Sequence, residues 1–317
     1  MNVRVVREAG GIGDIVRIIP VLRGLREKYP TARLWVFAPA TYRPLLRGWY
    51  DEFRPTPHAG RRPRDRELDE SRWPYLNVGE EFDVSIDLYC PAFRYEHEQR
   101  GKVSLDRIDL FCMAAEVEPS SKLPRVNLDS KDIETAADYI REHHLRDGKR
   151  LIAIQPFSTD PARNWPITNW EKLAYALEWV GYKTIILDSA CGRTKGFSQH
   201  RVLGKPLGFV AALLSQCDLL VGPDSGLGHL AAAVATVAVG VFASQSGEIM
   251  YRHYPLHTWI HPTRNGQAPC AWPCFWNRPP QCTRQNLLKA GKTCAMLARI
   301  SVETVFKTII AKMKPVP

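Results

Sequence analysis

The stretch DLLVGPDSGLGHLAAAV, residues 218–234, constrains the fold more than any other part of the chain. An apolar run leads into a tight Pro-Asp-Ser-Gly turn, and small residues at helical spacing follow it, which predicts a buried strand that feeds a helix. The first backbone N–H groups of such a helix lack intrahelical acceptors, and the helix dipole favours an anion beside them. The stretch therefore predicts a phosphate seat, with an ordinary capped strand–helix joint as the alternative.

Four residues of this turn are expected to serve the phosphate site. Ser225 stands at the helix start, where a serine can cap the helix and donate its hydroxyl. Gly226 and Gly228 let a ligand approach the backbone, and His229 lies one turn further in, facing the same ligand.

The chain opens with the same order of elements. Val3 to Val6 predicts a strand, Gly10-Gly11-Ile12-Gly13 a glycine loop, and the apolar residues after it a helix that Pro20 should bend. Asp14 lies in the first turn of that helix, where the dipole keeps a carboxylate ionised and ready to take a proton from a hydroxyl. We therefore predict that Asp14 is a general base; simple compensation of the dipole is the alternative.

Strands and helices alternate along the rest of the chain, as in parallel sheets covered on both faces. A mixed-charge insertion, residues 54–81, is expected to be a loop. Thr168 and Glu171 are expected to form a capping box, and Gly181 to end the helix that follows it. The expected elements are strands at 34–38, 84–88, 151–155, 182–188 and 219–221, and helices from Thr168 to Val180 and over 209–215.

At 317 residues the chain predicts two domains. We expect two Rossmann-like, doubly wound α/β domains over residues 1–148 and 149–300, facing each other across a ligand cleft. Residues 301–317 predict an amphipathic C-terminal helix, capped by Ser301, that packs back onto the protein.

The loop at 156–166 (PFSTDPARNWP) follows the first strand of the second domain and adds Ser158, Thr159 and Arg163 to the expected phosphate site. A guanidinium can hold a diphosphate through two parallel hydrogen bonds and stabilise the charge on a leaving nucleotide. The alternative is an exposed arginine beside a packed Trp165.

The formal net charge is +10, and nearly all of the excess lies after residue 250. Aromatic residues alternate with the basic ones there, which suits a polyanion because cations neutralise phosphates while rings stack on bases or sugars. A solvated basic tail with core aromatics is the alternative. The aromatic residues are Tyr251, Tyr254, Trp259, Trp272, Phe275 and Trp276.

Eight cysteines divide into two groups. Four lie in apolar surroundings and predict small core residues: Cys90, Cys112, Cys191 and Cys217. The other four lie in the basic segment 251–295, just after three histidines, and predict a structural zinc or cluster, disulfides, or reduced thiols. This late group comprises Cys270, Cys274, Cys282 and Cys294.

No run of about 20 apolar residues predicts a transmembrane segment, and the N-terminus does not predict a signal peptide. We expect a cytoplasmic protein, either at the inner face of the membrane or in a phage-infected host cell.

Three motifs in order and spacing together resemble glycosyltransferase family 9, the ADP-heptose:lipopolysaccharide heptosyltransferases and their relatives. They are GGIGDIVRIIPVLRGLREKYP, ARNWPITNWEKLAYAL and CDLLVGPDSGLGHLAAAV. The resemblance implies a GT-B fold, in which the N-terminal domain binds the acceptor and the C-terminal domain the nucleotide sugar. It also implies inverting transfer that needs no metal or other catalytic cofactor.

On this resemblance, Asp14 matches the catalytic aspartate of the family, and Asp224, Ser225, Gly226 and His229 match the turn that binds the donor diphosphate. Two positions depart from the family pattern. Arg163 stands where the family has lysine, which replaces a point donor by a planar fork. The segment DSACGRTKG, residues 188–196, lacks the glutamate-rich stretch that contacts the nucleoside in many relatives.

Two polyanionic acceptors fit the basic tail: lipopolysaccharide core at an anionic membrane surface, and hydroxymethylated bases of phage-type DNA. Two other classes of function stay open. A nucleotide-sugar epimerase of GT-B fold would turn over without an acceptor, and a non-catalytic polyanion-binding protein would tolerate loss of Asp14.

Overall fold

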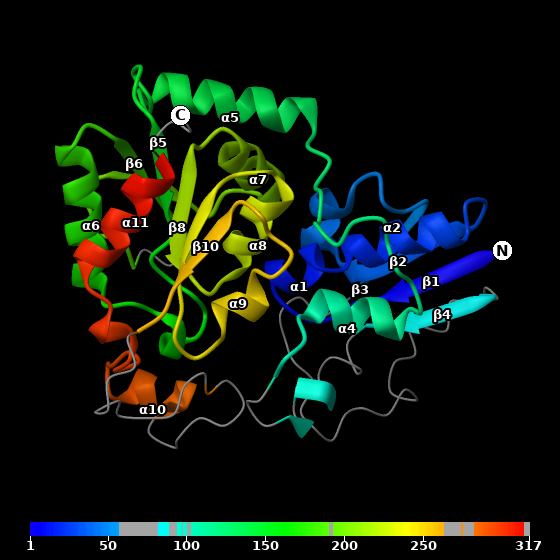
Figure 1. The fold of residues 1–317 in the computed structure, drawn as a ribbon. Helices are drawn as coiled ribbons and strands as arrows, with labels where there is room; N and C mark the ends of the chain where they lie inside the picture. Colours follow the sequence, from blue (N-terminus) through cyan, green and yellow to red (C-terminus); the bar gives the residue numbers. More distant parts are fainter. Residues whose placement is uncertain are drawn as a thin grey trace. The chain divides into compact units, whose positions relative to one another are not determined.

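The computed structural model describes residues 1–56, 82–88, 94–96, 98–99, 103–189, 193–262, 274 and 282–313. The chain divides into two compact units, one within Met1–Leu128 and one from Asp129 onward (Figure 1). This division lies earlier than the boundary expected after residue 148. The reason is that helix α5 (Ser130–Glu142) packs against α7 (Leu207–Ser215), which belongs to the second unit.

The first unit contains a four-stranded parallel sheet in the order β3-β2-β1-β4. Its strands are β1 (Asn2–Val6), β2 (Arg33–Pro39), β3 (Glu52–Thr56) and β4 (Val84–Asp87). Val3 and Val5 of β1 point to the same face of the sheet and are fully buried, as expected of a central strand whose face is covered by helices. The strand order changes direction between β1 and β4, and ligands of open α/β sheets bind beyond the carboxyl ends of the strands at such a point.

The helices of the first unit are α1 (Ile12–Val16), α2 (Ile19–Lys28), the 3-10 helix η1 (Ala40–Leu46) and α4 (Arg107–Ala114). The sequence predicts one helix bent at Pro20, but the structure has two separate helices there. The helix splits into α1 and α2, and Pro20 lies in the first turn of α2, where its missing N–H leaves no bond unmade.

The second unit contains a six-stranded parallel sheet in the order β10-β9-β8-β5-β6-β7. This is the doubly wound Rossmann order, and its direction changes between β5 and β8. The strands are β5 (Leu151–Ile154), β6 (Lys183–Asp188), β7 (His200–Leu203), β8 (Leu219–Pro223), β9 (Ala238–Val241) and β10 (His257–Ile260).

Helices cover both faces of this second sheet. Figure 1 shows α6 (Ile167–Trp179) and α11 (Val302–Met313) on one side, and α7 and α8 (Gly226–Ala233) on the other. The shorter helices are η4 (Pro161–Arg163), α9 (Gly247–Met250), α10 (Arg284–Lys289) and η6 (Leu297–Arg299). No helix in the described ranges combines the length and the apolar character that crossing a bilayer requires.

Helix α6 begins differently from the sequence expectation. It starts at Ile167, with Pro166 in the cap position and no side-chain capping bond, so the predicted capping box of Thr168 and Glu171 is wrong. The helix ends as predicted, because Gly181 follows it with a φ of +96°, a conformation that glycine adopts without strain.

The C-terminal helix packs on the second unit itself. Val305, Ile309 and Met313 of α11 are buried in one core cluster with Trp165 and Trp170. The Ser301 hydroxyl accepts the N–H of Thr304 at 3.1 Å, which confirms its predicted capping role.

Candidate functional site

The glycine loop of the first unit holds Asp14 at the carboxyl end of β1. Asp14 is the third residue of α1, and its carboxylate accepts the Gly11 N–H at 2.9 Å. Gly10 is essential to this approach. Its φ is +127°, and a Cβ at this position would lie 2.5 Å from the Asp14 carboxylate. Of the other two glycines of the predicted glycine loop, Gly11 faces open space and Gly13 is buried.

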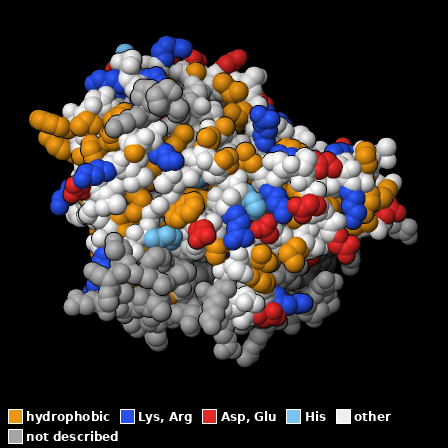
Figure 2. Space-filling view, in the orientation of Figure 1, with side chains coloured by type: hydrophobic (Ala, Val, Ile, Leu, Met, Phe, Trp, Pro, Cys, Tyr) orange, Lys and Arg blue, Asp and Glu red, His pale blue; other side chains and the backbone are white. Residues whose placement is uncertain are grey.

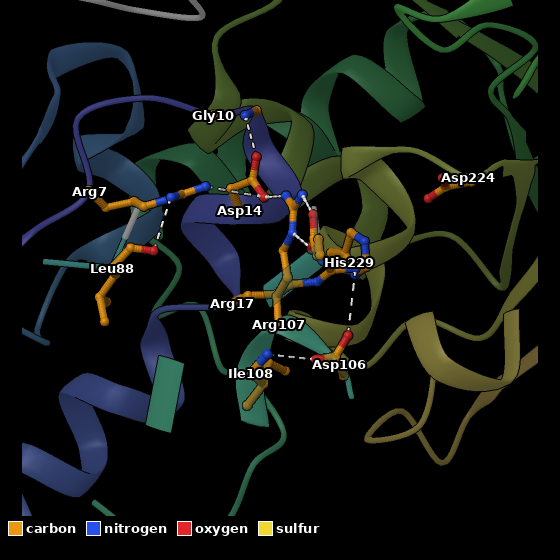
Figure 3. Close-up of polar contacts among 12 residues, drawn as sticks. Arg7, Gly10, Asp14, Arg17, Leu88, Asp106, Arg107, Ile108, Asp224 and His229 are labelled. Carbon is orange, nitrogen blue, oxygen red and sulfur yellow. Dashed lines mark hydrogen bonds and ion pairs between the residues drawn. The ribbon is translucent and has the colours of Figure 1, made fainter. Parts of the chain in front are cut away.

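Three arginines surround the Asp14 carboxylate, and no motif in the sequence indicates any of them. Arg107 donates a hydrogen bond to it, and an Arg7 nitrogen lies 3.5 Å from it (Figure 3). Burial opposes ionisation of Asp14, but the charges of Arg107, Arg7 and Arg17 outweigh burial and hold its pKa well below the ordinary value. Asp14 is therefore a carboxylate at every physiological pH.

The same arginines bind further acids in a buried network. Arg107 donates to Glu96 at 2.7 Å, and Arg17 pairs with Asp106 at 3.8 Å. Glu96 and Asp106 are each 2% exposed. Asp106 also caps α4 by accepting the Ile108 N–H at 2.8 Å, so the helix that carries Arg107 is fixed by the same network.

In the second unit, the predicted phosphate turn lies at the switch point between β5 and β8. Ser225 takes the cap position of α8, but its hydroxyl does not cap the helix and instead donates to the Gln155 side chain. The predicted capping role of Ser225 is therefore wrong. The first-turn N–H groups of α8 consequently receive no side-chain cap, which suits an anion.

Arg163 lies beside this turn, as the sequence predicts. Its guanidinium is 3.4 Å from the Asp224 carboxylate and donates to the Thr159 hydroxyl at 3.2 Å. Thr159 is exposed, whereas Asp224 is 5% exposed. The geometry thus brings Thr159, Arg163 and Asp224 together, with Asp224 in a position to orient the arginine.

Ser158 shapes the loop from the inside. It is 5% exposed, its N–H donates to the Asn164 side chain at 2.6 Å, and its hydroxyl accepts the Asp160 N–H at 3.4 Å. The neighbouring Trp165 is fully buried. Arg163 therefore extends from a loop whose backbone is held by local hydrogen bonds.

His229 lies one turn into α8 and is 4% exposed. Its Nδ1 pairs with the Tyr254 hydroxyl at 2.9 Å, and the Tyr251 ring lies edge-on to it. A Cβ at Gly228 would lie 2.3 Å from the Tyr251 hydroxyl, so Tyr251 is the reason a glycine is needed there. This contact gives Gly228 a packing role, and its expected part in ligand binding stays a prediction.

His257 of β10 forms a hydrogen bond with the first turn of α8. Its Nε2 donates to the Gly228 carbonyl at 2.9 Å, and burial lowers the pKa of the ring to about 4 despite this bond. The ring is therefore neutral at physiological pH.

The aromatic residues expected to bind a polyanion divide between core and surface. Tyr251 and Tyr254 are each 3% exposed, so for these two the expectation is wrong and the core alternative is correct. Trp259 is 36% exposed, and Trp272, Phe275 and Trp276 lie outside the described residues. On the face drawn in Figure 2, the basic side chains of the described residues are interspersed with acidic ones.

The late cysteines do not gather into a metal site in the part of the chain that the structure describes, where no three His, Cys, Asp or Glu side chains form such a group. Cys294 belongs to the hydrophobic core beside Met296 and Leu297. Cys274 is buried and Cys282 half-buried, while Cys270 lies outside the described residues.

Of the four cysteines predicted to lie in the core, two are described. Burial raises the pKa of both Cys112 and Cys217 to about 12, as expected of small apolar core residues. Cys90 and Cys191 lie outside the described residues.

Comparison with known proteins identifies a family. The chain matches the profile of Glycosyltransferase family 9 (heptosyltransferase) over residues 92–270, more than half of its length. No curated protein sequence matches it significantly.

Solved structures share the fold at low sequence identity. A glycosyl transferase family 9 protein from Veillonella parvula has a TM-score of 0.72 at 16% identity and covers 98% of this chain and 96% of its own. The ADP-heptose lipopolysaccharide heptosyltransferase II of E. coli has a TM-score of 0.68 at 18% identity, with 98% of both chains covered. The iron-containing dodecameric glycosyltransferase TibC of E. coli has a TM-score of 0.65 at 15% identity and covers 98% of this chain and 75% of its own.

Proposed function

Because the chain belongs to glycosyltransferase family 9 and has the GT-B fold, we propose that it transfers a sugar from a nucleotide-diphosphate sugar to a hydroxyl of a polyanionic acceptor. The observation that carries the proposal is the convergence of Arg163 and the start of α8 at the switch point of the second sheet. A cation beside a helix start that has no side-chain cap suits a diphosphate.

The donor half of the reaction belongs to the second unit. The diphosphate accepts hydrogen bonds from Arg163, Thr159 and the first turn of α8, while Asp224 orients the arginine. The bond between the anomeric carbon and the diphosphate oxygen breaks, and its electron pair leaves with the nucleoside diphosphate. Arg163 and the helix dipole stabilise the negative charge on that leaving group.

Asp14 of the first unit supplies the base. The acceptor oxygen attacks the anomeric carbon as its proton passes to the Asp14 carboxylate, and a single displacement inverts the configuration at that carbon. The nearby arginines keep Asp14 ionised but make it a weak base. An anionic group on the acceptor that pairs with Arg107 would relieve this, because it would draw positive charge away from Asp14.

The acceptor that fits best is lipopolysaccharide core, on the cytoplasmic face of the inner membrane. Proteins of the same fold include the ADP-heptose lipopolysaccharide heptosyltransferase II of E. coli, and this likeness favours lipopolysaccharide as the acceptor. Modified DNA is less favoured, because Tyr251 and Tyr254 are buried and cannot stack on bases.

The test is a transfer assay with ADP-heptose and lipopolysaccharide that lacks heptose, run beside hydroxymethylated DNA with the same donor. The expected product is heptosylated lipopolysaccharide of inverted anomeric configuration, identified by mass spectrometry and NMR. Transfer to DNA alone would show that modified DNA, and not lipopolysaccharide, is the acceptor. Donor turnover without any acceptor would favour the epimerase, and polyanion binding without turnover would favour a non-catalytic protein.

A further inference from the structure

One peptide group of the glycine loop is held by hydrogen bonds at both ends. Its N–H, from Gly11, donates to Oδ2 of Asp14 at 2.9 Å, and its carbonyl, from Gly10, accepts the Tyr42 hydroxyl at 3.1 Å. Figure 3 shows Gly10 beside the Asp14 carboxylate. Tyr42 of η1 is therefore linked to the proposed base through a single peptide group.

The two oxygens of the Asp14 carboxylate have different partners. Arg107 and Arg7 contact Oδ1, whereas the Gly11 N–H contacts Oδ2. The arginines alone leave the carboxylate free to turn about its contact at Oδ1. The peptide N–H at Oδ2 therefore completes the set of contacts that fixes the plane of the carboxylate.

Tyr42 is well placed to hold the other end of the peptide group. It is 8% exposed and lies in η1, which packs against α1. Burial and the charge of Asp14 raise the pKa of its hydroxyl above the ordinary value, so the hydroxyl keeps its proton and acts as a donor. A donor at the Gly10 carbonyl also polarises the peptide group and strengthens its N–H bond to Asp14.

The two glycines allow this peptide group to turn over when the donor is missing. Gly10 already has a φ of +127°. A flip of the peptide group would carry the φ of Gly11 from −94° to about +86°, a value that glycine adopts without strain and other residues rarely adopt. The Gly10 carbonyl would then face Asp14 and repel its carboxylate. Hydrogen bonds, and not the backbone itself, therefore decide which way the peptide group points.

We propose that Tyr42 is a positioning residue for the transfer reaction, whose hydroxyl locks the Gly10–Gly11 peptide group with its N–H toward Asp14. The lock keeps the carboxylate in the orientation from which it takes the proton of the acceptor. The inference rests on the proposed function, because it takes Asp14 as the base.

The first experiment measures kcat at saturating donor and acceptor, beside the calorimetric affinity for ADP. Tyr42→Phe removes only the hydroxyl, so kcat should fall roughly three- to tenfold while ADP affinity stays within about twofold. Tyr50→Phe is the matched control, because it removes a hydroxyl that contacts the exposed Arg43 side chain, and it should change neither quantity.

A second glycine-loop variant separates the lock from a merely structural role of Tyr42. Gly11→Ala alone should keep kcat within about twofold of the wild type, because a Cβ there meets nothing and the observed φ of −94° suits alanine. The double variant Tyr42→Phe with Gly11→Ala should recover kcat to within about twofold of the wild type, because alanine disfavours the positive φ of the flipped peptide.

The second experiment observes the peptide group itself and needs no substrate. In ¹⁵N-labelled protein, the hydrogen-exchange protection factor of the amide at position 11 should fall roughly threefold or more in Tyr42→Phe, because the flipped N–H loses its acceptor. The double variant should regain the protection of the wild type. Thermal melting of each variant checks its folding.

A double variant as slow as Tyr42→Phe, or an unchanged protection factor in Tyr42→Phe, would overturn the positioning role of Tyr42. Failure of the proposed function gives a different result. If the protection factors follow the prediction but Asp14→Asn transfers sugar at the wild-type rate, the peptide lock stands and Asp14 is not the base.

Discussion

The two units differ in polar structure at the points where the strand order of their sheets reverses. The first unit has a network of buried ion pairs there, and the second has a helix start without a side-chain cap. Around Asp14, side chains of opposite charge pair with one another: Arg7 and Arg107 with Asp14, Arg17 with Asp106, and Arg107 also with Glu96. Around the start of α8, the Ser225 hydroxyl donates to the Gln155 side chain, and Arg163 forms an ion pair with Asp224. The first arrangement fixes one carboxylate, and the second leaves donors available for an anion that arrives from solvent.

The largest expected effect tests Asp14, at the centre of the ion-pair network of the first unit. Asp14→Asn keeps the shape of the side chain and removes the proton acceptor, so kcat should fall about 10² to 10⁴-fold. ADP affinity, measured by calorimetry, should stay within about twofold, because the proposed donor site belongs to the other unit. A variant that transfers sugar at the wild-type rate would show that Asp14 is not the base.

The next prediction is that the two units lose stability in different pH ranges. The folded pKa of His257 lies below the unfolded value of 6.5, so its contribution to stability is present above pH 6.5 and is lost as the pH falls toward 4. The free energy of unfolding should decrease by up to about 3 kcal/mol over this range. The contribution of Asp14 is lost only below its ordinary pKa of 3.8, so the second unit should weaken first.

Urea unfolding at pH 7.5, 5.5 and 4.5 measures this decrease. His257→Gln, whose amide nitrogen can still donate to Gly228, should flatten the dependence in part. It should not abolish it, because burial also lowers the pKa values of His261 and His200 in the same unit. An equally steep dependence in this variant would assign the effect to other groups.

Removal of the cation tests the second unit directly. Arg163→Ala should weaken donor binding by roughly 1.5 to 3 kcal/mol, the typical contribution of a charged hydrogen bond. Arg163→Lys, which restores the residue type expected for the family, should recover part of this loss. Affinity that is unchanged in the alanine variant would remove Arg163 from the site.

A smaller effect tests why Gly228 is a glycine. In Gly228→Ala the new methyl group meets the Tyr251 hydroxyl, and such overpacking should lower the free energy of unfolding by about 1 to 3 kcal/mol. Adding Tyr251→Phe should restore part of the stability, because it removes the hydroxyl that the new methyl group contacts. Gly11→Ala is the matched control, since a Cβ there meets nothing. Equal destabilisation by both glycine variants would show that packing on Tyr251 is not the cause.

The smallest expected effect concerns metal. Since the proposed chemistry uses a carboxylate, an arginine and a helix start, dialysis against EDTA should leave kcat within about twofold of its value in untreated protein. The iron-containing relative TibC makes this worth measuring. A loss of activity that Zn²⁺ or Fe²⁺ restores would show that metal takes part.

The sequence by itself determined what depends on short-range pattern. The strands near 3–6, 34–38, 84–88, 151–155, 182–188 and 219–221 and the α/β class follow from local hydrophobicity and turn residues, and the structure confirms them. The approach of Arg163 to Asp224 was also expected, because loops at the carboxyl ends of adjacent parallel strands meet at one edge. The family resemblance, which rested on three motifs, is likewise confirmed.

Only the tertiary structure decided which distant side chains complete each site. Arg107 reaches Asp14 from 93 positions away, and nothing in the spacing of either residue indicates the pair. Tyr251 looked like part of a basic, aromatic surface, but its ring packs against α8 and dictates Gly228. Local pattern records what a residue does to its own helix or strand, whereas burial and charge pairing depend on which elements the completed fold brings together.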